Sequence, residues 1–269
     1  MIDVDLLLEL LLMIPDGASI VLIGDKDQLP PVASGQPFKD LIESDRIEVS
    51  RLTGNFRQEQ FSKTVKAARS IITGELPELT DNFDESDFTF IDCDASKQAN
   101  TILQYYFYFM PNNLSVEPQA IQILAPQRTG DVGVLRLNEL IQERVVKKSG
   151  KSLFSKKDRN RDIDFYVGDK VINRKNNYQK NVMNGDQGTI LRSAGGNLII
   201  EFDSVEKGTR EVEFEGLEKF QLDLAYATTV HSSQGSEYPG VIIPVVSAHS
   251  HMLSRNLLYT AVTRGKRKV

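Results

Sequence analysis

The sequence predicts an α/β fold with a mostly parallel sheet, into which a small antiparallel β-barrel is inserted. Short apolar runs typical of buried strands alternate with segments whose apolar residues recur at helical spacing. Between residues 161 and 221 that alternation stops, and short strand-like runs separated by Asn-Gly, Gly-Gly-Asn and Lys-Gly turns replace it. The alternation returns after Leu222, so the barrel is an insertion within an α/β domain and not an appendage.

The α/β elements are expected in a definite order along the chain. Helices are predicted at residues 5–13, 61–73, 99–109, 134–146 and 253–263, and strands at residues 18–23, 88–91, 120–124 and 241–246. The first helix is apolar on nearly every side, which predicts that it packs under a sheet. The β-branched run at 18–23 is typical of a strand buried on both faces. Residues 147–161 carry seven Lys or Arg against one Asp, so we expect a solvated linker there.

These elements divide the chain into three units. Residues 1–52 are expected to be the carboxyl-terminal part of a first α/β domain. Residues 53–160 and 222–269 together form a second α/β domain, and residues 161–221 form the barrel inserted into it.

Composition sets limits on the class of protein. Of the 269 residues, 40% are hydrophobic and 26% are charged, as in ordinary globular proteins, and the net charge of −5 requires any nucleic-acid contact to come from local patches. The single cysteine, Cys93, allows no intrachain disulfide and fits a reducing cytoplasm. The apolar run at 6–14 is too short to cross a bilayer, and the three histidines show no metal-like spacing with Cys93, so we expect no membrane span and no metal ligand set. Residues 78–94 hold seven acidic and no basic residues, which indicates a solvated loop or a partner site.

The string Gly-Asp-Lys-Asp-Gln-Leu-Pro-Pro-Val at residues 24–32 follows the predicted strand at 18–23. Ligands of open α/β sheets bind beyond the carboxyl ends of the strands, where Asp25 and Gln28 would sense a phosphate or a metal-bound water. The two prolines stiffen the loop at little entropic cost. Alternatively, the segment is a rigid Pro-Pro turn with a structural role only.

Residues 228–237 carry hydroxyls and an imidazole, which are side chains suited to contact a phosphate backbone. The expected contacts come from four side chains, Thr229, His231, Ser232 and Ser233. Gly235 permits a close approach, and Glu237 can accept a hydrogen bond from a ribose hydroxyl. His231 alone is equally compatible with a structural histidine.

Three further segments offer basic side chains. Arg128 follows a predicted buried strand, in a loop suited to the DNA backbone. In the barrel, Arg174 and Lys175 would hold phosphates while Tyr178 stacks on a base; alternatively, Tyr178 caps the barrel core. On the last helix, Arg264 lies opposite the apolar face and four residues after Thr260, which predicts that the helix presents this arginine without burying it.

These strings, in this order, resemble the later motifs of RecD-type DNA helicases of superfamily one, the family of the exodeoxyribonuclease V alpha subunit and its stand-alone relatives. Residues 24–32 are similar to motif III, residues 52–58 with Arg57 to motif IV, residues 228–237 to motif V and residues 257–264 to motif VI, and the barrel is similar to the SH3-like insertion. The resemblance implies RecA-like motor domains.

The resemblance also implies roles for individual residues. Arg264 would act as an arginine finger, Arg57 would reach the nucleotide across the cleft, and Gln28 would report the γ-phosphate state to the DNA groove. The residues implied to contact the nucleotide are Gly24, Asp25, Gln28, Arg57, Gly235, Glu237 and Arg264. The chain departs from the family at Ser232, where Lys is common, and at Gly265, where Ala is more frequent.

The implied activity is that of an ATP-dependent 5′-to-3′ DNA helicase on single-stranded DNA, with ATP and Mg²⁺ as cofactors of the intact parent and other subunits of a helicase–nuclease complex among its possible partners. No GxxxxGK[ST] phosphate loop occurs in the chain, and the family's Asp-Glu-Ala-Ser segment would lie immediately before Met1. We therefore expect a carboxyl-terminal portion that alone neither hydrolyses ATP nor unwinds DNA. Two alternatives remain open: a non-catalytic remnant that binds single-stranded DNA or a partner, and the helicase region of a conjugative relaxase.

Overall fold

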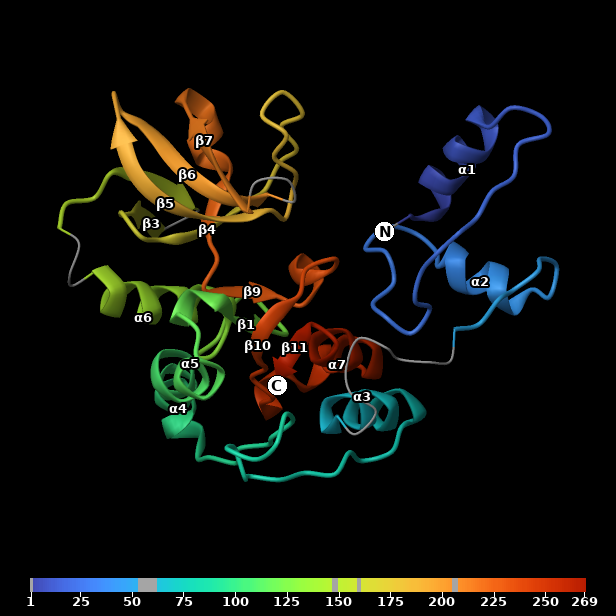
Figure 1. Ribbon diagram of the computed structural model, residues 1–269, viewed down its shortest axis with the longest axis horizontal. Coiled ribbons are helices and arrows are strands. Elements are labelled where there is room, and N and C mark those ends of the chain that lie inside the picture. Colours follow the sequence, from blue (N-terminus) through green and yellow to red (C-terminus); the bar gives the residue numbers. More distant parts are fainter. Residues whose placement is uncertain (1, 53–61, 147–149, 159–160, 205–207) are drawn as a thin grey trace.

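The computed structural model describes residues 2–52, 62–146, 150–158, 161–204 and 208–269. Its centre is a parallel sheet in the order β11 (Gly265–Lys268), β10 (Tyr238–Ile242), β1 (Ile121–Ala125) and β9 (Ala227–Thr229) (Figure 1). All pairs in this sheet are parallel, so the carboxyl ends of its strands meet at one edge. The predicted α/β fold with a parallel sheet is confirmed.

The strand β1 is buried along its whole length and separates two hydrophobic clusters. Ile121 and Ile123 face the cluster that holds Leu137 and Ile141, whereas Leu124 faces the cluster that holds Leu257. This alternation follows from the two-residue period of a strand. Helices therefore cover both faces of the sheet, as expected for a parallel sheet.

The first cluster is built on the helices α4 (Gln98–Gln104), α5 (Met110–Leu114) and α6 (Val134–Val146), with the π-helical turn η2 (Tyr105–Phe109) continuing α4. The second is built on α3 (Lys63–Thr73) and α7 (Arg255–Val262). Both α3 and α7 begin at a serine, Ser62 and Ser254, whose side chain accepts a hydrogen bond from a backbone N–H of the first turn.

The inserted segment, together with the strand that directly follows it, forms a five-stranded antiparallel sheet. Its order is β7 (Gly208–Phe214), β6 (Asn197–Ser204), β5 (Gln187–Ala194), β4 (Lys170–Asn173) and β8 (Leu222–Leu224). Figure 1 shows this sheet above the parallel sheet, with β8 descending directly to β9. The chain thus passes from the last strand of this antiparallel sheet to the edge of the parallel sheet that carries Thr229.

A buried pair of charged residues at the start of β4 anchors the insertion on the parallel sheet. Asp169 accepts hydrogen bonds from the Tyr226 hydroxyl (2.7 Å), Gln142 Nε2 (2.7 Å) and the Tyr166 backbone N–H (2.8 Å). Burial raises the pKa of Asp169 to about 6, although these hydrogen bonds oppose the rise. Lys170 Nζ donates to Gln122 Oε1 (2.9 Å) on β1, and burial lowers the pKa of Lys170 to about 7.

Because the folded-state pKa of Asp169 is raised, this carboxyl should make stability depend on pH. Its favourable contribution is complete below about pH 4 and is lost as the pH rises through about 6, a difference of roughly 3 kcal/mol. In Asp169→Asn, the amide can accept from Gln142 and Tyr166 and donate to Tyr226, and it does not titrate. We expect the free energy of unfolding of the wild type to fall relative to that of the variant between pH 4 and 6, as measured by urea denaturation at several pH values. A constant difference across this range would contradict the assignment.

Two predictions about the first 52 residues are wrong. Residues 18–23 form no strand, and the Ile23 side chain is 91% exposed. A strand forms only when a neighbour satisfies its backbone groups, and no described segment pairs with this run. The helix α1 (Val4–Met13) exists, but none of its residues is buried, so it does not pack under a sheet here. A further helix, α2 (Pro37–Glu43), was not predicted.

Two more predictions need correction. Residues 88–91 are not a strand, although this extended segment receives one strand-like pairing, in which the Thr89 N–H donates to the Val269 carbonyl (2.9 Å). The expected linker at 147–161 contains the first strand of a hairpin, β2 (Phe154–Asp158) paired with β3 (Arg161–Phe165). One of its lysines, Lys156, is buried and donates to the Leu222 carbonyl, whereas Lys151 and Lys157 are exposed. Among the helices of the described residues, none has the length and apolar character needed to span a membrane.

Candidate functional site

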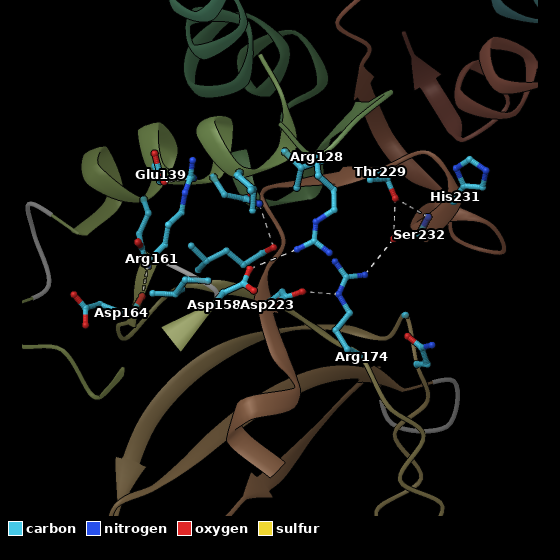
Figure 2. A pocket seen from close by; sticks show the side chains of 18 of the residues that line it. Arg128, Glu139, Asp158, Arg161, Asp164, Arg174, Asp223, Thr229, His231 and Ser232 are labelled. Atoms are coloured by element: carbon cyan, nitrogen blue, oxygen red, sulfur yellow. Dashed lines mark hydrogen bonds and ion pairs between the residues drawn. The ribbon is translucent and has the colours of Figure 1, made fainter. Parts of the chain in front are cut away.

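A cavity of about 670 Å³ lies where the hairpin β2–β3, the helix α6, the inserted sheet and the loop after β9 meet (Figure 2). Five of the eight side chains predicted to contact DNA line it: Arg128, Arg174, Thr229, His231 and Ser232. The parallel sheet brings them together, because β1 and β9 are neighbours and the loops that follow their carboxyl ends lie side by side. Arg174 comes from the insertion on the opposite wall.

The two arginines point into the cavity from different walls (Figure 2). Arg174 Nε donates to Asp223 Oδ2 (2.8 Å), and its Nη1 donates to Ser232 Oγ (3.1 Å). Arg128 is half exposed and makes a longer ion pair with Asp158 on β2 (3.7 Å). Each guanidinium is therefore oriented by a carboxylate while still lining the cavity.

The loop after β9 presents a pair of hydroxyls. Thr229 Oγ1 and Ser232 Oγ are 2.9 Å apart, and the Ser232 N–H donates to Thr229 Oγ1 (3.3 Å). Burial lowers the pKa of His231, so its imidazole is neutral at pH 7. Ser233 behaves differently: it is fully buried, and its hydroxyl donates to the Val230 carbonyl (2.7 Å), which stabilises the turn.

The remaining basic and aromatic candidates of the insertion lie outside the cavity. Lys175 is exposed, and Tyr178 is 75% exposed, so Tyr178 does not cap the core of the inserted sheet. Nearby Lys180 is held by Glu218 Oε2 (2.6 Å). Lys175 and Tyr178 thus occupy an outer surface of the insertion and not the cavity wall that Arg174 lines.

The loop predicted to sense phosphate contacts α7. Asp25 Oδ2 accepts hydrogen bonds from the Tyr259 hydroxyl (2.9 Å) and from Gln28 Nε2 (3.2 Å). The Leu29 N–H donates to Thr260 Oγ1 (2.8 Å), and Gln234 Nε2 donates to the Leu29 carbonyl (3.0 Å). The structure therefore links three of the sequence strings, residues 24–32, 228–237 and 257–264. Next to this loop, a Cβ added at Gly24 would lie 3.1 Å from the Phe38 ring, a tight contact that favours glycine.

The expectation that Arg264 is presented without being buried is wrong. The residue is 6% exposed, and its guanidinium donates to the carbonyls of Thr260 and Ser236 (both 3.2 Å). A single helical face could not reveal this, because Ser236 belongs to a loop distant in sequence. In that loop, Gly235 has a positive φ of 86° and Glu237 pairs with Lys266 (3.6 Å). Arg57 lies outside the described residues.

Sequence reasoning assigned no role to three residues that position side chains or backbone at the cavity. Asp223 orients Arg174, and Lys156 holds Asp223. Asp223 lies on a strand of three residues, and Lys156 lies on a charged strand, so neither strand was predicted. Asn138, on α6, is 5% exposed and hydrogen-bonds three backbone groups of the segment before Thr229. A buried asparagine on an otherwise apolar helical face was the available signal.

Comparisons with known proteins agree with this architecture. Three family models match: an AAA domain at residues 1–91, an ATP-dependent RecD-like DNA helicase SH3 domain at 137–214 and a UvrD-like helicase C-terminal domain at 224–269. The ATP-dependent RecD2 DNA helicase of Deinococcus radiodurans is 35% identical over 264 residues, which cover 97% of this chain and 33% of that protein. The RecBCD enzyme subunit RecD of Mycobacterium tuberculosis is 27% identical over 289 residues, which cover 100% of this chain and 47% of the relative.

A solved structure shows the same fold. The Bacteroides Pif1 bound to single-stranded DNA superposes with a TM-score of 0.53 at 18% identity, over 93% of this chain and 60% of that one. The chain thus spans between a third and about half of the two curated relatives. The parallel sheet, the inserted SH3 domain and the motif strings all agree: the chain belongs to the RecD-like helicases.

Proposed function

We propose that this chain contributes the DNA-holding part of an ATP-dependent 5′-to-3′ helicase, and that the cavity binds the phosphate backbone of single-stranded DNA. The observation that carries the proposal is the meeting of Arg128, Arg174 and the Thr229–Ser232 hydroxyl pair in one cavity. Guanidinium groups and hydroxyls are the side chains that bind phosphate oxygens without reading sequence. Single-stranded DNA is also the ligand named for the Bacteroides Pif1 structure.

The domain division that we propose follows the three units of the sequence: residues 1–52, residues 53–160 with 222–269, and the insertion 161–221. Residues 24–32 contact α7 and Gln234, so nucleotide-dependent movement of the first unit would be felt at the loop that carries Thr229. We infer that Gln28 and Asp25 serve this coupling. Other subunits of a helicase–nuclease complex are possible partners, since one relative is a RecBCD subunit.

ATP and Mg²⁺ would be held largely by residues outside this sequence. The chain contains no GxxxxGK[ST] loop, and the described residues include no cluster of three or more His, Cys, Asp or Glu able to hold a metal ion. Arg264 and Asp25 would add to a nucleotide site but do not form one. We therefore expect a polypeptide of these 269 residues to show no ATP hydrolysis above background in a phosphate-release assay. Turnover that disappears on Arg264→Ala would contradict this.

The proposed DNA site is tested by affinity and its dependence on salt. Affinity for a fluorescent oligothymidylate about 15 nucleotides long should fall with rising salt, since bound phosphates release counterions. Arg128→Ala and Arg174→Ala should each lower the affinity several-fold and reduce the slope of log K against log salt by about 0.7. Arg192→Ala is the matched control, because Arg192 pairs with Glu211 on the inserted sheet and does not line the cavity. Equal effects of all three substitutions on affinity would contradict the proposal that the cavity is the DNA-binding site.

A further inference from the structure

Asp223 holds two cations that come from different elements. Its Oδ1 accepts from Lys156 Nζ (2.8 Å) on β2, and its Oδ2 accepts from Arg174 Nε (2.8 Å) after β4. Burial alone would raise the pKa of Asp223, but the hydrogen bonds and charges of Lys156 and Arg174 outweigh it and lower the pKa. The carboxylate is therefore ionised at pH 7, at a point where β8 leaves the insertion for the parallel sheet.

Lys156 is fixed independently of Asp223. Its side chain is 8% exposed, and its ammonium also donates to the carbonyls of Leu222 (2.5 Å) and Phe220 (3.3 Å). A buried ammonium with two carbonyl partners besides Asp223 has little freedom to move. Lys156 holds Oδ1 of Asp223, so the position of Oδ2, which accepts from Arg174, is also fixed.

Arg174, oriented in this way, contacts the loop after β9. With Nε bound to Asp223, the planar guanidinium places Nη1 3.1 Å from Ser232 Oγ. Ser232 is paired with Thr229, so one cation and two hydroxyls face the same part of the cavity (Figure 2).

We propose that Asp223, backed by Lys156, is a positioning residue that fixes Arg174 against Ser232, so that one phosphate is held jointly by the insertion and by the loop after β9. This inference rests on the proposed function, because it names how the cavity grips the strand. The hairpin β2–β3 contributes to phosphate binding indirectly, because its Lys156 holds Asp223.

The sign of one substitution separates this role from simple electrostatics. Asp223 lines the cavity and is negative, so a carboxylate that only repels DNA should give tighter binding when it is neutralised. If Asp223 positions Arg174, Asp223→Asn should instead weaken binding, because an amide can no longer accept from both cations. Asp162 is the matched control: it also lines the cavity, and Asp162→Asn should leave the affinity unchanged or raise it.

The experiment measures the affinity of the chain for a fluorescent oligothymidylate about 15 nucleotides long at several salt concentrations. We expect Asp223→Asn to lose roughly three- to tenfold in affinity and to show the reduced salt slope of Arg174→Ala, with no further loss in the double variant. Arg174→Lys, which keeps the charge but cannot bridge Asp223 and Ser232 with a planar fork, should resemble Arg174→Ala even if Asp223→Asn fails to fold.

Three outcomes would overturn the inference. Asp223→Asn could bind as tightly as Asp162→Asn, the losses of Asp223→Asn and Arg174→Ala could add, or Arg174→Lys could bind like the unmodified chain. If the unmodified chain itself shows no salt-dependent binding, the proposed function fails and this inference fails with it, a result distinct from the other three.

Discussion

Replacing Asn138 by alanine should lower the free energy of unfolding by about 3 kcal/mol, or the melting temperature by roughly 6–12 °C. Asn138 Nδ2 donates to the carbonyls of Leu224 (3.2 Å) and Ala227 (2.9 Å), and its Oδ1 accepts from the Ala227 N–H (2.8 Å). The side chain is 5% exposed, so truncation would leave these backbone groups buried without their partner. Thermal unfolding followed by circular dichroism measures the effect.

Glu143, exposed on the same helix, provides the control, and Glu143→Ala should change the melting temperature by no more than a degree or two. Asn138→Asp is a sharper comparison, since it keeps an acceptor for Ala227 but loses both donated bonds and buries a charge. If Asn138→Ala unfolds within two degrees of the wild type, the three hydrogen bonds do not hold this junction.

The position of Asn138 gives this prediction a functional side. Ala227 begins β9, and Thr229 ends it at the cavity. A shift of the Ala227 peptide would therefore displace the hydroxyl pair of Thr229 and Ser232. The helix α6 supports the strand that carries the proposed phosphate contacts, in addition to filling the core.

Sequence periodicity predicted a helix correctly, because the backbone hydrogen bonds of a helix form between residues close together in the sequence. The helix at 134–146 was predicted with the observed bounds, because Leu137 and Ile141 recur at helical spacing and face the core. The strand at 18–23 failed for the opposite reason: its β-branched pattern describes a residue preference, but a strand exists only when a neighbour pairs with it. Exposed Ile23 shows that no described segment covers it.

Site residues that are adjacent in one sequence motif could be predicted, whereas residue pairs that are far apart along the chain could not. Thr229, His231 and Ser232 were found because they are adjacent in one motif. Asp223 was missed because its two partners lie 67 and 49 residues away along the chain, in a segment taken for a linker and in the loop after β4. The burial of Arg264 was missed likewise, since the Ser236 carbonyl that it binds comes from another loop.

In the complete protein, which we propose hydrolyses ATP, Arg264→Ala should lower the turnover number by about 10³–10⁵-fold, as expected for loss of an arginine finger. The guanidinium donates to the carbonyls of Thr260 and Ser236, which orients it. Its charge acts on Tyr259, whose hydroxyl donates to Asp25. Phosphate oxygens are stronger acceptors than backbone carbonyls, so a bound nucleotide phosphate would replace these bonds of the arginine.

Because Arg264 is buried, the substitution will also affect stability, and the two effects must be separated. Arg264→Lys keeps the charge but not the bidentate geometry and should lose nearly as much turnover, while both variants retain salt-dependent binding of oligothymidylate within a few-fold of the wild type. Arg267, exposed on β11 and bonded to the Leu114 carbonyl, is the control, and Arg267→Ala should leave turnover unchanged. Turnover of Arg264→Ala within tenfold of the wild type, at a temperature where the variant is folded, would make Arg264 a structural residue that holds the Ser236 loop on α7.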